Sequence, residues 1–344
     1  MKVVVFRKDG VLHSTDWASV WIEYFEANGI EYKAVDLLKT NAIEELKGYD
    51  MLLWQFAIAD YRQMLEARSI LYSAKRMGLK VFPDFNDSWH KDDKIAEMYL
   101  LQSVNAPIPK SFVFYDLETL KTALNNGDIQ FPIIFKLKAG SGSNNVKMVK
   151  TRRQLLSYAK RMFGRGYSPA PSVVFKASSH IQSSHNWETV KKKFKRIPEF
   201  LSTLKGYKLY PNERGYVYLQ EFIPNDGFDM KVVVVGDKLA GFSRPTRKND
   251  FRASGGGEFI FDRSKFTKNV IESAFEVSKK MGSVCIGFDY VIDKRTEKGY
   301  IVEMCCGFAH SALLGMKGWF DKDCVWHDGE LNAPIEIFKI LASE

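Results

Sequence analysis

Cysteine is scarce in this chain and unevenly placed. The 344 residues include four cysteines, all of them beyond residue 284, and two of these, Cys305 and Cys306, are adjacent. Cysteines this few, late and clustered do not form the disulfide framework of small secreted domains. We therefore expect a reduced compartment and a cytoplasmic protein.

Long apolar runs are missing as well. No stretch approaches the roughly 20 apolar residues that span a bilayer, so no membrane span is predicted. The chain starts with a short apolar run, Met1 to Phe6, which Arg7 and Lys8 follow. A secretory signal places its positive charges first and has a longer apolar segment, so none is predicted here.

Two familiar glycine-rich fingerprints are also absent. The N-terminal part has no Gly-x-Gly-x-x-Gly, and the Gly/Ser loop that starts at Ala139 lacks the spacing Gly-x-x-x-x-Gly-Lys-Ser/Thr. The sequence therefore supports neither a dinucleotide-binding site nor a Walker A site.

The composition is that of a large globular protein with a basic balance. Hydrophobic residues make up 45% of the chain and aromatic residues 14%, and the net charge is +9. A chain of this length exceeds what one hydrophobic core usually supports, so two or three subdomains are expected. A basic surface favours anionic partners, but both signs of charge occur along the whole chain, and ordinary solvated surface is the default explanation.

The pattern of strands and helices divides the chain into three parts. Residues 1–85 alternate short strands with helices, which predicts a parallel sheet with helices on its faces, an α/β domain. Residues 86–222 predict a second α+β unit, with an irregular insert at about 164–215. Residues 223–344 predict a third, with strands at 229–235 and 238–243, a helix at 267–281, a hairpin at 285–303 and a closing helix at 334–342.

The hairpin carries the most informative pair of residues. If Asp293 pairs with Gly299 across its turn, then Asp289 lies opposite Glu303 on the same face. Opposed like charges are unfavourable on a sheet, and such a carboxylate pair suits a hard divalent cation such as Mg²⁺ or Mn²⁺. The alternative is two solvated acids on an exposed edge.

Three further segments carry candidate nucleotide-binding residues. Lys136 ends a buried strand just before the small residues Gly140, Ser141, Gly142 and Ser143, whose backbone N–H groups could approach phosphate oxygens. The alternative is a flexible hairpin turn. The run Gln220, Glu221, Phe222, Ile223 and Pro224 ends another strand, where accessible backbone could contact an adenine edge, and Asp229 and Lys231 alternate on the strand that follows. Arg244, Arg247 and Arg252 precede the glycines of 255–257 and suit the charge that develops in phosphoryl transfer, although a solvated loop has the same composition.

The order of these pieces, with Lys94 on a helix before them, resembles the ATP-grasp superfamily over about residues 86–307. More narrowly, it is similar to the branch that includes the ligases adding glutamate tails to a ribosomal protein. The resemblance implies an ATP-grasp fold of two α+β lobes, 86–222 and 223–344, preceded by a Rossmann-like pre-ATP-grasp domain at 1–85.

The resemblance also implies a reaction and a role for each residue. The reaction is the ATP-dependent joining of a carboxylate to an amine through an acyl phosphate, with release of ADP and phosphate. The implied ATP contacts are Lys94, Lys136, Gly140, Ser141, Gly142, Ser143, Gln220, Glu221, Phe222, Ile223, Asp229 and Ser254. The implied catalytic residues are Arg252, Arg244 and Lys231, and the implied ligands of Mg²⁺ or Mn²⁺ are Asp289, Glu303 and Cys305.

Three positions depart from the pattern of the superfamily. Glu-x-Asn reads Glu303-Met-Cys305, Phe-Arg-x-Asn reads Phe251-Arg-Ala-Ser254, and Asp-x-Arg reads Asp229-Met-Lys231. A thiolate is a poor partner for Mg²⁺, so the identity or geometry of the metal site is open. An ATP-binding protein without catalysis, a kinase that stops at phosphoryl transfer and an anion- or nucleic-acid-binding protein remain as alternatives.

Some patterns favour ordinary structure over function. Cys306, His310, Cys324 and His327 have tolerable zinc spacing, but free cysteines after a buried strand are commonly core residues. His180 and His185 are interpreted as surface histidines, and the basic run 191–196 as a solvated helix rather than a docking element. The substrates are expected to be a small-molecule, peptide or glycan carboxylate and an amine, with an acidic acceptor favoured by the basic balance and nucleic acid disfavoured.

Overall fold

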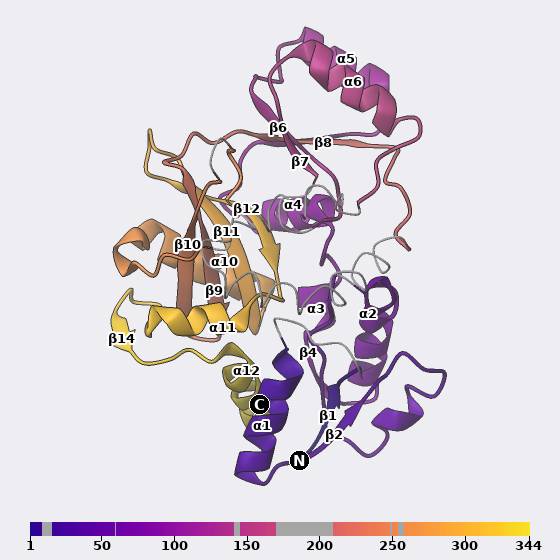
Figure 1. The fold of residues 1–344 in the computed structure, drawn as a ribbon, viewed down its shortest axis with the longest axis vertical. Coiled ribbons are helices and arrows are strands. Elements are labelled where there is room, and N and C mark those ends of the chain that lie inside the picture. Colours follow the sequence, from indigo (N-terminus) through magenta and orange to yellow (C-terminus); the bar gives the residue numbers. More distant parts are fainter. Residues whose placement is uncertain (9–15, 59, 141–144, 170–208, 248–249, 254–257) are drawn as a thin grey trace, which may run out of the picture.

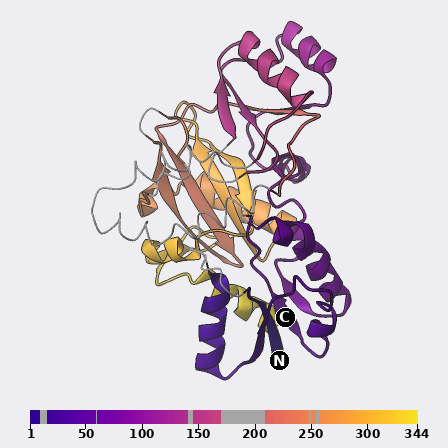
Figure 2. The same cartoon turned by 45° about the vertical axis from the view of Figure 1, so that its right-hand side comes forward.

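The computed structural model describes residues 1–8, 16–58, 60–140, 145–169, 209–247, 250–253 and 258–344. Three β-sheets follow one another along the chain; in space the central and N-terminal sheets lie at opposite ends of the molecule, with the C-terminal sheet between them (Figure 1). The two chain ends lie close together at the same end (Figure 2). Among the described residues, no helix is both long enough and apolar enough to cross a membrane.

The N-terminal sheet is parallel, as predicted. Its strand order is β2-β1-β3-β4. The strands are β1 (Lys2–Phe6), β2 (Glu31–Val35), β3 (Met51–Leu53) and β4 (Lys80–Phe82), and the helices are α1 (Trp17–Asn28) and α2 (Tyr61–Arg76). The side chain of Asp16 caps α1, and Gly29, with a φ of 64°, ends it in the left-handed conformation that glycine adopts without strain.

The central sheet is antiparallel and has the order β5-β8-β6-β7. Its strands are β5 (Ser111–Phe114), β6 (Ile133–Lys136), β7 (Val146–Val149) and β8 (Val217–Glu221), and its helices are α5 (Leu117–Asn125) and α6 (Arg152–Met162). Both helices lie on one face of the sheet, and their apolar sides complete its core (Figure 1). The opposite face is left toward the rest of the molecule.

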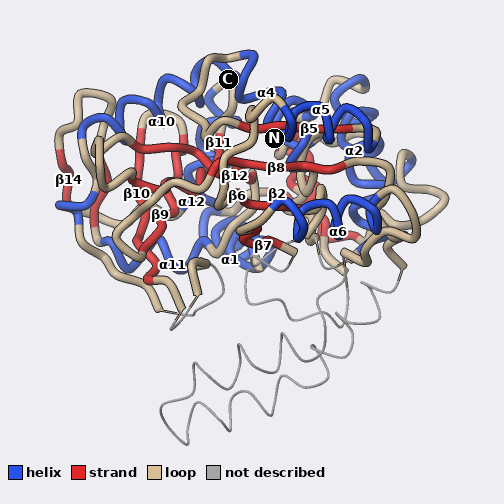
Figure 3. The backbone as a smooth tube through the Cα atoms, turned by 90° about the horizontal axis from the view of Figure 1, so that it is seen from above, coloured by secondary structure: helices blue, strands red, loops and turns tan. Residues whose placement is uncertain are grey.

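The C-terminal sheet has six strands in the order β12-β11-β9-β10-β13-β14. They are β9 (Phe228–Val235), β10 (Lys238–Pro245), β11 (Cys285–Ile292), β12 (Gly299–Cys305), β13 (Gly318–Phe320) and β14 (Trp326–Asp328). Helices α10 (Lys268–Met281) and α11 (His310–Leu313) lie on opposite sides of it (Figure 3). The sequence analysis missed β13, β14 and α11, because each is too short to show a period.

Two elements tie the three sheets together. The closing helix α12 (Ala333–Ser343) packs against α1 and β9, so the N-terminal domain and the C-terminal sheet share one apolar core. Helix α4 (Lys94–Ser103), which follows the short α3 (Phe85–Ser88), places Ile95 and Met98 in the central core and Leu101 in the C-terminal core. Short 3-10 turns complete the elements at Glu44–Leu46, Arg263–Lys265 and Leu314–Met316.

Candidate functional site

A cleft lies between the central sheet and the C-terminal sheet. Both sheets contribute residues to its wall. The predicted site residues that line it are Lys136, Gln220, Glu221, Phe222, Ile223, Asp229, Arg252, Asp289 and Glu303. Segments more than 160 residues apart in the sequence thus meet in one place. Ser141, Gly142, Ser143 and Ser254 lie outside the described residues, as do His180, His185 and the basic run.

The acidic pair is present, although the register that predicted it was wrong. Gly299 pairs with Ile292 rather than with Asp293, which alone would set Asp289 opposite Val302. Between these pairs and Asp289 the register shifts by one residue, because β12 carries an extra residue, Val302. This bulge restores the pairing of Asp289 with Glu303.

The same bulge explains how Lys136 is held. Its ammonium donates hydrogen bonds to the carbonyl oxygen of Val302 at 2.9 Å and to Oε1 of Gln220 at 2.6 Å. The carbonyl of a bulge residue is free of the regular ladder and can accept from a side chain. Lys136 is 6% exposed, and burial, together with the positive charge of Lys94, lowers its pKa to about 8.

Asp289 lies in a buried network of charges. Its carboxylate is 2.5 Å from the Lys231 ammonium and 3.1 Å from the Arg244 guanidinium, which also binds Asp229 through two hydrogen bonds of 2.7 and 2.9 Å. Burial alone would raise the pKa of Asp289, but Arg244 and Lys231 outweigh it and hold the pKa at about 2. For Asp229 burial prevails, and its pKa rises to about 6. Asp289 is therefore firmly ionised.

Helix α4 holds the second acid of the pair. The Lys94 ammonium donates to the carbonyl of Gly140 at 2.7 Å and lies 3.3 Å from Glu303. Burial opposes the charge on Lys94, but Glu303, Asp92 and Glu97 outweigh burial and raise its pKa. One turn along α4, Glu97 accepts a hydrogen bond from the N–H of Met304 at 3.2 Å. The sequence analysis missed Glu97. The available signal was its position three residues after Lys94, which puts both side chains on the same face of the helix.

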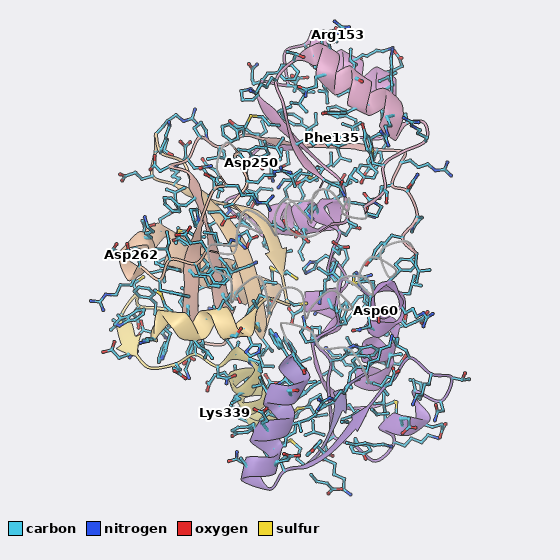
Figure 4. The ribbon with its side chains drawn as sticks, in the orientation of Figure 1. Asp60, Phe135, Arg153, Asp250, Asp262 and Lys339 are labelled. Atoms are coloured by element: carbon cyan, nitrogen blue, oxygen red, sulfur yellow. The ribbon has the colours of Figure 1, made fainter. Side chains whose placement is uncertain are left out.

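The rim of the cleft is aromatic and basic. Phe222, which follows β8, meets Phe251 edge to face at 6.3 Å between ring centroids. Arg252 binds both carboxylate oxygens of Asp250 and also donates to the carbonyl of Val146 at 3.4 Å, which joins the two lobes across the cleft. Asp250 lies where the C-terminal sheet approaches the central lobe (Figure 4).

Cys305 pairs with Gly287 in the strand ladder, two residues beyond Glu303 and on the same face of β12. Its sulfur accepts a hydrogen bond from the N–H of Gly307 at 3.3 Å. The neighbouring Cys306 thiol, with Lys91 and Lys231, lowers the pKa of Cys305 to about 6 against the effect of burial. Among the described residues, no three His, Cys, Asp or Glu side chains are arranged to hold a metal ion.

The members of the discounted zinc pattern have other surroundings. His327 lies 2.7 Å from Asp321 and stacks on Trp319 at 4.2 Å between ring centroids. Cys306 is buried in the core of the C-terminal sheet, and all four cysteines are free thiols. Trp54 is fully buried in the N-terminal core.

No family model matches this chain, and no curated protein matches it. Solved structures do. D-alanine–D-alanine ligase from Bacillus anthracis is 14% identical, with a TM-score of 0.61 over 100% of this chain and 98% of that one, and the ligase complexed with ATP is 12% identical, with a TM-score of 0.57 over the same shares. A D-cycloserine synthetase is 11% identical, with a TM-score of 0.60 over 100% and 99%. A RimK domain ATP-grasp protein from Sphaerobacter thermophilus is 17% identical, with a TM-score of 0.50 over 88% and 90%. The chain therefore has the ATP-grasp fold, as the sequence predicted.

Proposed function

We propose that this protein is an ATP-dependent carboxylate–amine ligase that forms an amide through an acyl phosphate and releases ADP and phosphate. One observation carries the proposal: Asp289 and Glu303 pair across β11 and β12 in a cleft between two lobes, and Lys136 binds the carbonyl of Val302, the residue next to Glu303. Similar solved structures are named as ligases and synthetases, one of them with ATP, which supports the same reaction class.

The nucleotide would lie along the cleft. Glu221, Phe222 and Ile223 line its wall where β8 ends and would present backbone to an adenine edge, while Lys136 and Lys94 would contact the phosphates. Arg252, already positioned across the lobes, would contact the transferring phosphoryl group. Asp229 and Gly140 would complete the nucleotide contacts, with Arg244 and Lys231 stabilising charge next to Asp289.

The acidic pair fits a hard divalent cation, because it supplies two carboxylates on one face, with Glu303 about one third exposed (33%). The sulfur of Cys305 does not suit Mg²⁺ and suits softer ions better. We therefore assign Asp289 and Glu303 as the residues that would hold Mg²⁺ or Mn²⁺, with Cys305 beside them. When bound, such an ion neutralises phosphate oxygens during transfer.

The residues of the chain do the rest by position and charge. The substrate carboxylate attacks the γ-phosphorus, the bond to the β-phosphate oxygen breaks, and ADP leaves; an amine then displaces phosphate from the acyl carbon. Phosphoryl transfer needs little covalent help from a protein beyond alignment and charge. Lys136, Lys94 and Arg252 supply that charge from buried or braced positions.

The proposal also includes a pocket for the acceptor. We place it at the loop after Glu303, because Gln55 of the N-terminal domain, residues 1–85, and Lys91 just beyond that domain closely approach Gly307 there. The division into a central lobe, 86–222, and a C-terminal lobe, 223–344, belongs to the same proposal. The carboxylate and amine would be small molecules, peptides or glycans, and the scarcity of cysteine supports a cytoplasmic location.

Replacing Lys136 with methionine tests the proposed function. We expect the kcat/KM for ADP release, screened over pools of carboxylates and amines with Mg²⁺ and Mn²⁺, to fall about 100-fold, because one preorganised charge in a water-poor site has roughly that effect. The fold should persist, since methionine keeps the length of the side chain.

Lys147→Met is the matched control. Lys147 is on β7 of the same sheet, its ammonium lies 4.9 Å from the ring centroid of Tyr158, and it does not line the cleft. ADP release that is unaffected by Lys136→Met, or reduced equally by both changes, would rule out the proposed site.

Replacing Cys305 with asparagine tests the metal assignment. An amide oxygen is a harder donor than sulfur, so the ratio of activity with Mg²⁺ to activity with Mn²⁺ should rise about tenfold. The same variant tests the rival function, an ATP-binding regulator without catalysis. Two observations favour this rival: Asp289 and Glu303 are already paired with lysines, and Cys305 offers sulfur where Mg²⁺ prefers oxygen. A wild type that binds ATP without releasing ADP, and a variant that releases ADP, would establish the rival. An unchanged ratio would place Cys305 away from the metal.

A further inference from the structure

Three consecutive backbone N–H groups at the start of the Gly/Ser loop donate hydrogen bonds to carboxylates. The N–H of Lys138 donates to Oε2 of Glu213 at 2.9 Å, and that of Ala139 donates to Oε1 of the same residue at 2.8 Å. The N–H of Gly140 donates to Oδ1 of Asp92 at 2.8 Å. Glu213 therefore holds two adjacent peptide groups with its two oxygens, an arrangement that a carboxylate can make and an amide cannot.

The first of these peptides lies two residues beyond Lys136. The segment is fixed from its other side too: the N–H of Lys94 donates to the carbonyl of Lys138 at 3.0 Å, and the Lys94 ammonium donates to the carbonyl of Gly140. The beginning of the loop is thus clamped between α4 and Glu213. A shift in its backbone would move Lys136 and Lys94 relative to each other.

Glu213 lies at the base of the insert, by which we mean the two described ends of the insert, residues 164–169 and 209–215. It is held there by Tyr167. Its N–H and carbonyl form a two-way bridge with Tyr167, at 2.8 and 3.0 Å. Gly166 makes this approach possible, because a Cβ at that position would lie 2.2 Å from the carbonyl oxygen of Glu213. At the far end of the loop, Asn145 donates to the carbonyl of Pro169 at 3.1 Å. Both ends of the Gly/Ser loop are therefore bonded to the base of the insert.

Glu213 is in a site where burial makes an ionised carboxylate costly unless its hydrogen bonds compensate. Burial raises its pKa, and the hydroxyl of Tyr216 and the N–H groups of Lys138 and Ala139 oppose that effect. No lysine or arginine among the described residues lies within ion-pair distance of it. A buried carboxylate whose partners are two peptide N–H groups and a hydroxyl is consistent with a role in shaping that backbone.

We propose that Glu213 is a positioning residue for nucleotide binding: by holding the N–H groups of Lys138 and Ala139, it sets the backbone that carries Lys136 into the cleft. The inference rests on the proposed function only in that the cleft binds a nucleotide. It requires no ligase chemistry. It also gives a role to the backbone bridge between Tyr167 and Glu213, which fixes Glu213 in place.

Glu213→Gln is the direct test. The glutamine oxygen can accept from one N–H, but its NH₂ group would face the other, so one of the two N–H groups loses its carboxylate acceptor. The N–H of Lys138 also donates to the Tyr216 hydroxyl at 2.7 Å, whereas that of Ala139 donates to Glu213. We expect the Kd for a non-hydrolysable ATP analogue, measured by calorimetry, to rise about tenfold, and at least one of the amides of Lys138 and Ala139 to exchange with solvent at least tenfold faster. If turnover is present, KM for ATP should rise with kcat nearly unchanged.

Glu118→Gln on α5 is the matched control, since this glutamate is in the same lobe, 80% exposed, and pairs with Lys121 on the surface. It should change neither quantity. Tyr216→Phe, which keeps the carboxylate, should retain most of the affinity. A Glu213→Gln protein that folds with unchanged Kd and unchanged amide exchange would overturn the inference alone. A wild type that binds no nucleotide would overturn both it and the proposed function, whereas nucleotide binding without ADP release would sink only the ligase.

Discussion

Replacing Asp289 with asparagine is expected to abolish ADP release, with a loss of about 10³-fold or more, and to lower the free energy of unfolding by about 3–5 kcal/mol. The activity would fall because one of two carboxylates proposed to hold the metal is removed. The stability would fall because the carboxylate is buried and holds Lys231 at 2.5 Å and Arg244 at 3.1 Å. Breaking a buried pair leaves charge without compensation. ADP release and urea unfolding measure the two effects.

Glu303→Gln separates these effects. The Glu303 side chain is 33% exposed, and its ion-pair contact is with Lys94 at 3.3 Å, which keeps the Gly140 carbonyl as a partner. We expect a loss of activity as large as for Asp289→Asn, but a smaller loss of stability, about 1–2 kcal/mol, because buried Lys94 keeps Asp92 and Glu97 nearby. Equal destabilisation by both changes would contradict the assignment of Asp289 as the structural centre of the charge network. Retained activity in either variant would contradict the metal assignment.

Local patterns predicted the elements well and the pairing less well. The parallel N-terminal sheet follows from alternating strand and helix signals, and the helix predicted at 267–281 is α10, Lys268–Met281. The Asp289–Glu303 pair was predicted from a register that is wrong by one residue and that the bulge at Val302 corrects. A bulge in the middle of a strand of ordinary β residues leaves no signal in the sequence.

The partners of the site residues could not be predicted, because they come from distant segments. Glu213 reaches Ala139 across 74 residues and Glu97 reaches Met304 across 207. Neither acid stands in a motif of its own. The order of lysines, glycines and acids along the chain was enough to indicate the fold, but not that Lys231 and Lys94 already contact the two acids. Such contacts depend on how the lobes pack, which no local period encodes.

Replacing Asp87 with asparagine is expected to stabilise the protein increasingly as the pH rises. Asp87 lies on α3, is 1% exposed, and faces Ser283 and the backbone of Val284 in the C-terminal lobe. Burial raises its pKa from 3.8 to about 7, and the nearby Ser283 hydroxyl and Val284 backbone offset this only in part, since neither carboxylate oxygen of Asp87 has a hydrogen-bond partner among the described residues. No lysine or arginine of the described residues is paired with it.

The sign follows from proton binding. Because the folded-state pKa exceeds the unfolded one, the folded protein retains a proton that the unfolded chain releases, and this contribution is complete below pH 3.8 and is lost as the pH rises to about 7. Asparagine stays neutral, so its advantage over wild type should grow by about 3 kcal/mol between pH 5 and pH 8, at 1.36 kcal/mol per pKa unit. Urea unfolding at both values measures it, with Asp128→Asn as the exposed control, for which no such growth is expected. An advantage that is equal at pH 5 and pH 8 would mean that Asp87 is ionised in the folded protein, and that the junction of α3 with the C-terminal lobe tolerates a buried charge.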